Sequence, residues 1–313
     1  MKILFMGTPD IARDCLKAVY EAGHDIVGVV TVPDKPNTRN KKIIFSEVKE
    51  FALSHNLRLM QPEKLKDNEE FKKEVESLNP DILCIVAYGK YLPKAYLSMC
   101  KYEPINIHPS LLPKYRGPAP IQWAVLNGDK ETGSTSMYIS EKMDAGDIIL
   151  QEKLEIGEYE TTGELWDRLS KLSGELLVKT LKEIEAGTAP RKPQGEEFSQ
   201  VSMIDKAMAK IDFEKSAEEI KNLVRGLNPF MGAYGFMDGK KIKLWKVIIR
   251  ELSDENKTKA NGEVLEADDK KGLFIKVKDG VLEVLEIQGE NSKRMSAQDY
   301  LRGNKINIGN KFE

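Results

Sequence analysis

The chain has 313 residues, of which 41% are hydrophobic and 31% charged, and its 48 basic and 50 acidic side chains give a formal net charge of −2. That length suits two globular domains, and the balanced charge excludes an overall basic field, although it does not exclude a local basic face. The three cysteines form no CxxC pair and no apolar run reaches the length of a membrane span, so we expect a cytoplasmic protein without a signal peptide or a membrane anchor.

The first part of the chain alternates short apolar runs with helical patterns. Strands are predicted at residues 2–6, 25–31, 81–89 and 103–108, and helices after residue 10 and near 44–56 and 67–77. The stretch VPDKPNTRNKK (32–42) is polar, basic and contains two prolines, which is typical of a loop. Strands that alternate with helices predict an α/β domain with a Rossmann-like open parallel sheet and helices on both faces.

One long helix is predicted at 161–186, and Gly187 follows its last turn. The stretch behind it is rich in proline and charge, which indicates a linker. We therefore expect a catalytic domain at 1–188, a linker at 189–204 and a second domain at 205–313.

The second domain has a different residue pattern. A helix at 216–225 precedes five short strands separated by tight turns, at 233–237, 241–249, 262–266, 273–278 and 281–288. This pattern predicts a small, OB-like β-barrel. The stretch KKIKLWK (240–246) places lysines around Trp245, which fits either a solvated strand face or a nucleic-acid contact, and charge alone favours neither.

The stretch INIHPSLLPKYRGPAPIQ (105–122) carries one of only three histidines in the chain. Asn106 and His108 stand two residues apart at the end of a predicted strand, so both side chains should point to the same side of the sheet. In open parallel sheets, ligands bind beyond the carboxyl ends of the strands. An amide that can donate to an oxyanion, beside an imidazole that titrates near neutrality, suits acyl transfer. A lone histidine at a strand end is also commonly structural.

Two aspartates offer a third group. Asp144 and Asp147 lie in MDAGDII, and a carboxylate near His108 could orient the ring, but both could equally serve the turn, and spacing does not choose between them. Two other chemistries fit less well. A dinucleotide site would have a GxGxxG fingerprint after the first strand, where only Gly7 is present. A serine hydrolase would have a Gly-x-Ser-x-Gly elbow, and none surrounds Ser110. We also expect no metal site, since no suitable ligand cluster is apparent.

Several motifs together resemble the folate-dependent formyltransferases. NIHPSLLPKYRG, with the later MDAGDII, is similar to the signature of that family. FMGTPDIA at the start, VPDKPNTRNKK, RGPAPIQWAVLNGD, and NPFMGAYG followed by KLWK and MSAQDYL are similar to the branch that acts on methionyl-tRNA. The resemblance runs from residue 1 to about residue 310.

The resemblance implies roles for individual residues. It implies that Asn106, His108 and Asp144 are catalytic. It implies folate contacts in the SLLP stretch and at the end of the 81–89 strand, by Ser110, Leu111, Leu112, Pro113, Tyr88, Gly89 and Leu92. It implies tRNA contacts in the 32–42 loop and in the second domain, by Arg39, Lys41, Lys42, Lys240 and Lys243. The family usually has glycine on both sides of the loop arginine, where this chain has Thr38 and Asn40.

The implied reaction moves the formyl group of 10-formyltetrahydrofolate to the α-amine of methionine on initiator methionyl-tRNA, which prepares that tRNA for translation initiation. Asn106 and His108 would stabilise the tetrahedral oxyanion and assist proton transfer, and Asp144 would orient His108. The expected partners are this folate, as a formyl-donating substrate, and the tRNA, with no metal and with the protein as a monomer.

Three alternatives share parts of this pattern. A sugar-amine formyltransferase has the same trio but a different C-terminal module. A formyltetrahydrofolate deformylase usually carries an added N-terminal domain, which we do not expect because the catalytic pattern begins at Met1. A noncatalytic tRNA-binding protein would not need the complete trio.

Overall fold

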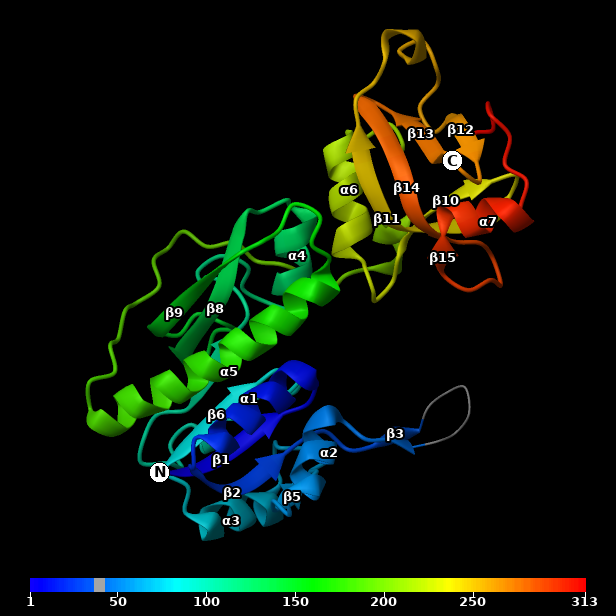
Figure 1. The fold of residues 1–313 in the computed structure, drawn as a ribbon. Helices are drawn as coiled ribbons and strands as arrows, with labels where there is room; N and C mark the ends of the chain where they lie inside the picture. The colour runs from blue at the N-terminus through cyan, green and yellow to red at the C-terminus, as the bar shows by residue number, and fades with distance from the viewer. Residues whose placement is uncertain (37–42) are drawn as a thin grey trace. The chain divides into compact units, whose positions relative to one another are not determined.

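The computed structural model describes residues 1–36 and 43–313 (Figure 1). The chain folds into two compact units. The first comprises Met1–Pro120, Thr132–Glu155 and Trp166–Val201, and the second comprises Ile121–Glu131, Ile156–Leu165 and Ser202–Glu313. The expected domain limits 1–188 and 205–313 stay a prediction, while the compact units themselves are assembled from segments that are not continuous in sequence.

The first unit is built on a seven-stranded sheet with the order β5-β2-β1-β6-β7-β8-β9. These strands are β1 (Lys2–Gly7), β2 (Asp25–Val30), β5 (Leu59–Met60), β6 (Ile82–Val86), β7 (Ile105–His108), β8 (Glu131–Tyr138) and β9 (Ile148–Glu155). The strands from β5 to β7 pair in parallel, whereas β8 pairs with β7 in the antiparallel sense. The predicted Rossmann-like, mostly parallel sheet is confirmed.

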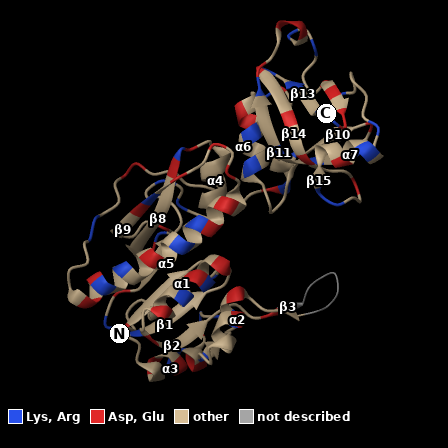
Figure 2. Ribbon diagram, in the orientation of Figure 1, with Lys and Arg blue, Asp and Glu red and all other residues tan. Residues whose placement is uncertain are grey.

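Apolar residues alternate along β1 and pack into two separate clusters. Ile3 and Phe5 belong to one cluster, with residues of α1 (Asp10–Glu21), α2 (Glu47–Ser54) and α5 (Thr162–Ala186). Leu4 and Met6 belong to the other, with residues of α3 (Glu69–Leu78). Because successive side chains of a strand point to opposite faces, the two clusters lie on the two faces of the sheet. Helix α5 carries both acidic and basic residues (Figure 2).

The same alternation places the polar residues of β7. Ile105 and Ile107 are buried in the cluster that includes α1 and α5. Asn106 and His108 therefore point to the opposite face of the sheet. Asn106 is opposite Ile85 of β6 and Met137 of β8, so the two polar residues stand on an inner strand.

The second unit contains a sheet in which every pairing is antiparallel, with the order β10-β11-β14-β13-β12 and with β15 beside β14. Its strands are β10 (Ala233–Met237), β11 (Lys240–Arg250), β12 (Val264–Asp268), β13 (Gly272–Val277), β14 (Gly280–Gln288) and β15 (Met295–Ser296), and its helices are α4 (Pro120–Leu126), α6 (Ala217–Gly226) and α7 (Ala297–Gly303). The predicted second domain of short strands is confirmed as an antiparallel sheet, and its closure into an OB-like barrel stays a prediction. The elements α4, α7 and β15 were not predicted. Short 3-10 turns occur at Lys94–Tyr96, Lys206–Ala209 and Asp254–Asn256.

Helix α6 explains why residues 156–165 belong to the second unit. The guanidinium of Arg225 is buried and donates to the carbonyl oxygens of Gly157 and Glu160, each at 3.1 Å. Its Nε donates to Oδ1 of Asn222 at 2.8 Å. Arginine has five N–H donors and no acceptor, so such a set of carbonyl partners satisfies a buried guanidinium and ties the segment to the helix.

Residues 32–42 were predicted to form a loop. The structure instead has a short antiparallel pair at its limits, β3 (Lys35–Pro36) with β4 (Ile43–Ile44). The predicted tRNA contacts Arg39, Lys41 and Lys42 lie outside the described residues.

The predicted linker is hydrogen-bonded to the first unit along much of its length. The backbones of Lys192 and Ile148 bond to each other in both directions, at 2.8 and 2.9 Å. The backbone of Arg116 accepts from Val201 at 2.8 Å and donates to Ser199 at 2.9 Å. Residues 192–201 are therefore part of the first unit, although their composition resembles that of a linker.

Candidate active site

Asn106 and His108 stand at the carboxyl end of β7, as predicted. Asn106 is half-buried, and the side chain of His108 is buried. His108 is opposite Thr135 of β8, a residue whose hydroxyl is itself buried. The polar pair therefore lies where ligands bind in open parallel sheets, beyond the ends of the parallel strands.

The two ring nitrogens of His108 face different partners. Nε2 lies 2.9 Å from the carbonyl oxygen of Tyr115, and because a carbonyl only accepts, Nε2 carries a proton. Nδ1 lies 3.7 Å from Oδ2 of Asp144, which is an ion-pair distance rather than a hydrogen bond. Asp144 thus places a carboxylate beside Nδ1, while the Tyr115 carbonyl fixes the orientation of the ring.

Asp144, and not Asp147, is the aspartate near the histidine. Oδ2 of Asp144 also accepts from the backbone N–H of Gly117 at 2.8 Å. Asp147 instead lies beside Arg191, with Oδ2 3.7 Å from Nε. The alternative that spacing left open is thereby decided by the fold.

The turn that carries Asp144 requires its glycine. Asp144 has a φ of 51°, and a Cβ at Gly146 would lie 1.8 Å from the carbonyl oxygen of Tyr138. Only glycine permits so close an approach between two backbones. The Asp-Ala-Gly sequence therefore brings the carboxylate back toward β7.

The residues of the SLLP stretch lie in different environments. The hydroxyl of Ser110 is buried and donates to the carbonyl oxygen of Lys114 at 2.7 Å, so it closes its own loop. Leu112 packs with Met137 and Ile148. Leu111 and Pro113 are half-buried. The two half-buried residues are the ones that remain open to a ligand.

The residues after β6 also differ in their exposure to solvent. The side chain of Tyr88 is buried in the cluster that includes α3, where burial, and then the nearby Tyr96, raise its pKa to about 12. Leu92 is buried in the same cluster. Gly89 is exposed and has a φ of 82°, a conformation that glycine adopts without strain. Tyr88 and Leu92 are therefore part of the core, whereas Gly89 is at the surface after β6.

The sequence matches two family descriptions, Formyl transferase over residues 1–181 and Formyl transferase, C-terminal domain, over residues 203–305. It is 46% identical to the methionyl-tRNA formyltransferase of Clostridioides difficile over 99% of each chain. It is 44% identical to that of Lachnospira eligens over 99% of this chain and 98% of the relative. The chain belongs to the methionyl-tRNA formyltransferase family.

Solved structures of related architecture have a lower sequence identity to this chain. An N-formyltransferase from Helicobacter canadensis, in complex with folinic acid and dTDP-3-aminofucose, superposes with a TM-score of 0.65 at 19% identity, over 91% of this chain and 99% of that one. HypX from Aquifex aeolicus in complex with tetrahydrofolic acid gives a TM-score of 0.64 at 18% identity, over 99% of this chain and 50% of that one. These two likenesses show the formyltransferase fold.

The lysines predicted for tRNA binding in this formyltransferase have different surroundings. Lys240 is exposed at the start of β11. Lys243 is half-buried, and its ammonium donates to the carbonyl oxygen of Met231 at 2.8 Å and lies 5.2 Å from the ring of Trp245. Burial, and then Lys241, lower the pKa of Lys243. Lys243 therefore already has partners within the second unit, and its contact with tRNA stays a prediction.

The sequence analysis missed a half-exposed group of aromatic and basic side chains around β10. Tyr234 and Phe236 are neighbours on one face of β10, with ring centroids 5.6 Å apart. Lys241 lies 3.5 Å from the ring of Tyr234, and Lys210 lies 5.7 Å from the ring of Phe236. We call Tyr234, Phe236, Lys210 and Lys241 the aromatic–lysine face. The alternation AYGFM in β10 was the signal that could have found it.

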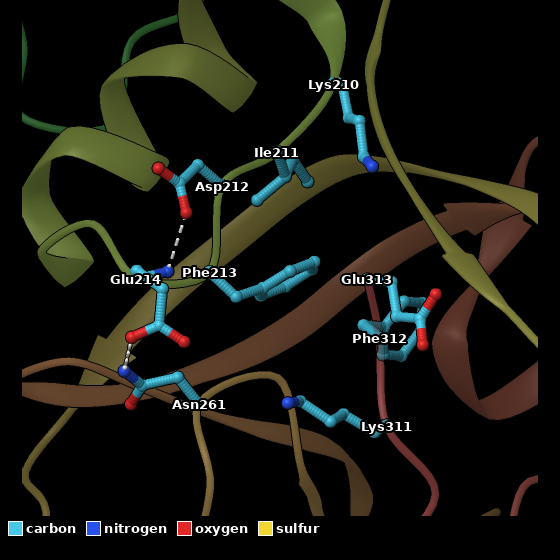
Figure 3. A pocket seen from close by; sticks show the side chains of 9 residues that line it. All are labelled: Lys210, Ile211, Asp212, Phe213, Glu214, Asn261, Lys311, Phe312 and Glu313. Atoms are coloured by element: carbon cyan, nitrogen blue, oxygen red, sulfur yellow. Dashed lines mark hydrogen bonds between the residues drawn. The ribbon is translucent and has the colours of Figure 1, made fainter.

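A pocket of about 440 Å³ lies in the second unit, beside Lys210 (Figure 3). Its lining carries charges of both signs, from Lys210, Asp212, Glu214, Lys311 and Glu313. Part of its polar lining is already paired, since Asn261 donates to Glu214 at 2.5 Å and Asp212 accepts from the backbone of Glu214 at 3.0 Å. None of the predicted site residues lines this pocket.

Within the described ranges 1–36 and 43–313, no group of three or more His, Cys, Asp or Glu residues could hold a metal ion. The helices of the same ranges include none that is long and apolar enough to cross a bilayer.

Proposed function

We propose that this protein transfers the formyl group of 10-formyltetrahydrofolate to the α-amine of methionine on initiator methionyl-tRNA. The observation that carries the proposal is the contact of His108 with Asp144, beside Asn106 at the end of β7, in a chain 46% identical to a methionyl-tRNA formyltransferase. An amide, an imidazole and a carboxylate in this arrangement suit acyl transfer without a metal.

In the proposed reaction the neutral amine attacks the formyl carbon. The formyl oxygen becomes an oxyanion, the bond between carbon and N10 then breaks, N10 gains a proton, and the new amide loses one. Asn106 would donate its side-chain N–H to the oxyanion. Such a donor stabilises the oxyanion more strongly than the carbonyl of the ground state.

His108 would assist the proton transfer to N10. The proton would pass through Nδ1, because Nε2 donates to the Tyr115 carbonyl, whereas Nδ1, at 3.7 Å from Oδ2 of Asp144, is too far from it for a hydrogen bond. Asp144 would stabilise the protonated ring as charge develops. The buried setting strengthens both electrostatic interactions, since little water screens them.

The folate would lie against the half-buried Leu111 and Pro113 and the backbone near Gly89. Gly89 follows β6, and Leu111 and Pro113 follow β7, so all three lie beyond the carboxyl ends of these two neighbouring strands. We assign Ser110, Leu112, Tyr88 and Leu92 to the support of this pocket rather than to direct contact, since their side chains are buried.

The tRNA would be held by two regions. Arg39, Lys41 and Lys42 are assigned to the acceptor end on the basis of the family motif. The aromatic–lysine face is assigned to the body of the tRNA, because aromatic rings that stack on bases and cations that contact phosphates commonly act together in single-stranded nucleic-acid sites. Lys240, exposed nearby on β11, would add a phosphate contact.

A direct assay tests the proposal. The purified protein is incubated with 10-formyltetrahydrofolate and with either initiator methionyl-tRNA, elongator methionyl-tRNA or an amino-sugar nucleotide. We expect formyl-methionine on the initiator tRNA and little transfer to the other two acceptors. Efficient transfer to the nucleotide sugar alone would assign the site to sugar-amine formylation.

A further inference from the structure

The segment between the long helix α5 and the second unit contacts the loops that hold the catalytic pair. We call residues 194–201 the strap. It includes Gln194, whose amide reaches two other segments of the first unit, and Ser199, whose side chain and backbone bind the loop after β7. The strap was predicted to be part of a linker.

Gln194 connects the two loops that carry the partners of His108. Its Nε2 donates to the carbonyl oxygen of Asp144 at 2.9 Å and to that of Gly146 at 2.7 Å. Its Oε1 accepts from Nε of Arg116 at 3.0 Å and from Nη2 of the same guanidinium at 2.7 Å. Carbonyls only accept and a guanidinium only donates, so this position requires a side chain with both functions, which a primary amide provides.

The partners of Gln194 are adjacent to the catalytic contacts. Asp144 faces Nδ1 of His108 with its carboxylate, and Gln194 holds its carbonyl. Arg116 lies between Tyr115, whose carbonyl holds Nε2 of His108, and Gly117, whose N–H donates to Asp144. Both protein contacts of the imidazole thus come from loops that Gln194 joins.

Ser199 strengthens the same loop from the other end of the strap. Its hydroxyl accepts from the backbone N–H of Tyr115 at 2.8 Å, and its backbone N–H donates to the carbonyl of Pro113 at 3.2 Å. The ring of Phe198 lies 4.4 Å from the guanidinium of Arg116, which stacks the arginine in the orientation that Gln194 binds.

We infer that Gln194 is a positioning residue for formyl transfer, which fixes Asp144 and the Tyr115 carbonyl against His108 through Arg116 and the Asp144 turn. The inference rests on the proposed function. Misplacement of a catalytic group by about 1 Å can lower the rate by roughly a hundredfold, so the loss of this connection should reduce turnover without removing any group that touches the substrate.

The test uses the full-length protein and measures kcat and KM for methionyl-tRNA and for the folate. Gln194→Ala should lower kcat by roughly tenfold or more and leave both KM values within about twofold. Gln194→Glu keeps the interaction with Arg116 but loses donation to the two carbonyls, so it should be impaired as well. Gln200→Ala is the matched control, because Gln200 is exposed on the same strap, and should behave as wild type.

A double-mutant cycle separates positioning from a general loss of stability. If Gln194 acts through Asp144, Gln194→Ala should slow Asp144→Asn much less than it slows the wild type. The inference would be overturned if Gln194→Ala lowered kcat by the same factor in the wild type and in Asp144→Asn. It would also be overturned if the Gln194→Ala enzyme were as fast as Gln200→Ala. Circular dichroism and a thermal midpoint of each variant identify any that fails to fold, and Gln194→Glu, nearly the same in shape, then carries the test.

Failure of the inference can be distinguished from failure of the proposed function. A wild-type protein that does not formylate methionyl-tRNA would refute the proposed function. A wild type that is active and depends on His108, but is indifferent to both Gln194 variants, would refute the inference alone.

Discussion

The polar atoms at the end of β7 determine the chemistry at the scale of single residues. Asn106 and His108 point to the face of the sheet opposite the cluster of Ile105 and Ile107, and both ring nitrogens of His108 face protein groups. Only the orientation of each side chain, and not its presence in the sequence, makes the pair suitable for acyl transfer.

Replacement of either residue by alanine should impair the chemical step. We expect Asn106→Ala and His108→Ala each to lower kcat by roughly a hundredfold or more, since the loss of one oxyanion donor costs about 3–4 kcal/mol. Single-turnover transfer at saturating folate measures this step. A rate near that of the wild type in either variant, with normal circular dichroism, would contradict the role assigned to that residue.

The two aspartates allow a matched comparison. Asp144→Asn removes the carboxylate charge that faces His108, so it should lower kcat and also change the pH dependence of kcat. Asp147→Asn, at a residue that lies beside Arg191, should leave both unchanged. Identical pH profiles for wild type and Asp144→Asn would indicate that Asp144 serves only the turn.

At the scale of elements, β10 and β11 present a surface on which aromatic rings and lysines lie side by side. The alternation in β10 buries Ala233, Gly235 and Met237 and leaves Tyr234 and Phe236 half-exposed, with lysines beside both rings. Stacking on aromatic rings and charge contacts with phosphates differ in their dependence on salt, so they can be separated by experiment.

Two substitutions should distinguish these contributions. Tyr234→Ala should weaken the binding of tRNA with little change in its salt dependence, by about 1–3 kcal/mol if a base stacks on the ring. Lys241→Ala should weaken binding and reduce the salt slope by about one unit or less. Filter binding at several salt concentrations measures both effects. The control is Lys278→Ala, an exposed lysine in the turn after β13; an equal loss of affinity there would argue against a specific face.

At the scale of the whole molecule, the compact units suggest a division of labour, with the folate site in the first and a tRNA-binding face in the second. The first unit extends to Val201, because the strap is hydrogen-bonded to it. Truncation before Val201 should therefore remove part of the first unit, although the composition of this segment resembles that of a linker.

Two truncated chains test this division. A chain that ends at Val201 should bind 10-formyltetrahydrofolate nearly as tightly as the full chain and bind tRNA much more weakly. A chain that ends at Pro190 also lacks the strap. Compared with the chain that ends at Val201, it should have a lower thermal midpoint and a lower kcat at saturating tRNA. Calorimetry with the folate and filter binding with tRNA provide the measurements. Full activity of the Val201 chain on methionyl-tRNA would show that the second unit is not needed.

The sequence by itself determined the features that depend on local periodicity. The strand INIH, the long helix after Thr161 and the five strands of the second unit follow from alternation, from helical spacing and from turn residues, and all are present in the structure. The position of Asn106 and His108 at a strand end followed from the same pattern.

Only the tertiary structure decided what depends on contacts between distant residues. Asp144 could not be distinguished from Asp147 by spacing, because 36 positions separate Asp144 from His108 and only the fold of the turn brings them to 3.7 Å. Gln194 lies in a stretch with no periodic signal, and its partners are 50 and 78 positions away. Hydrogen bonds between such distant side chains and backbones leave no pattern in the local sequence, because any residue with a suitable donor and acceptor could occupy the position.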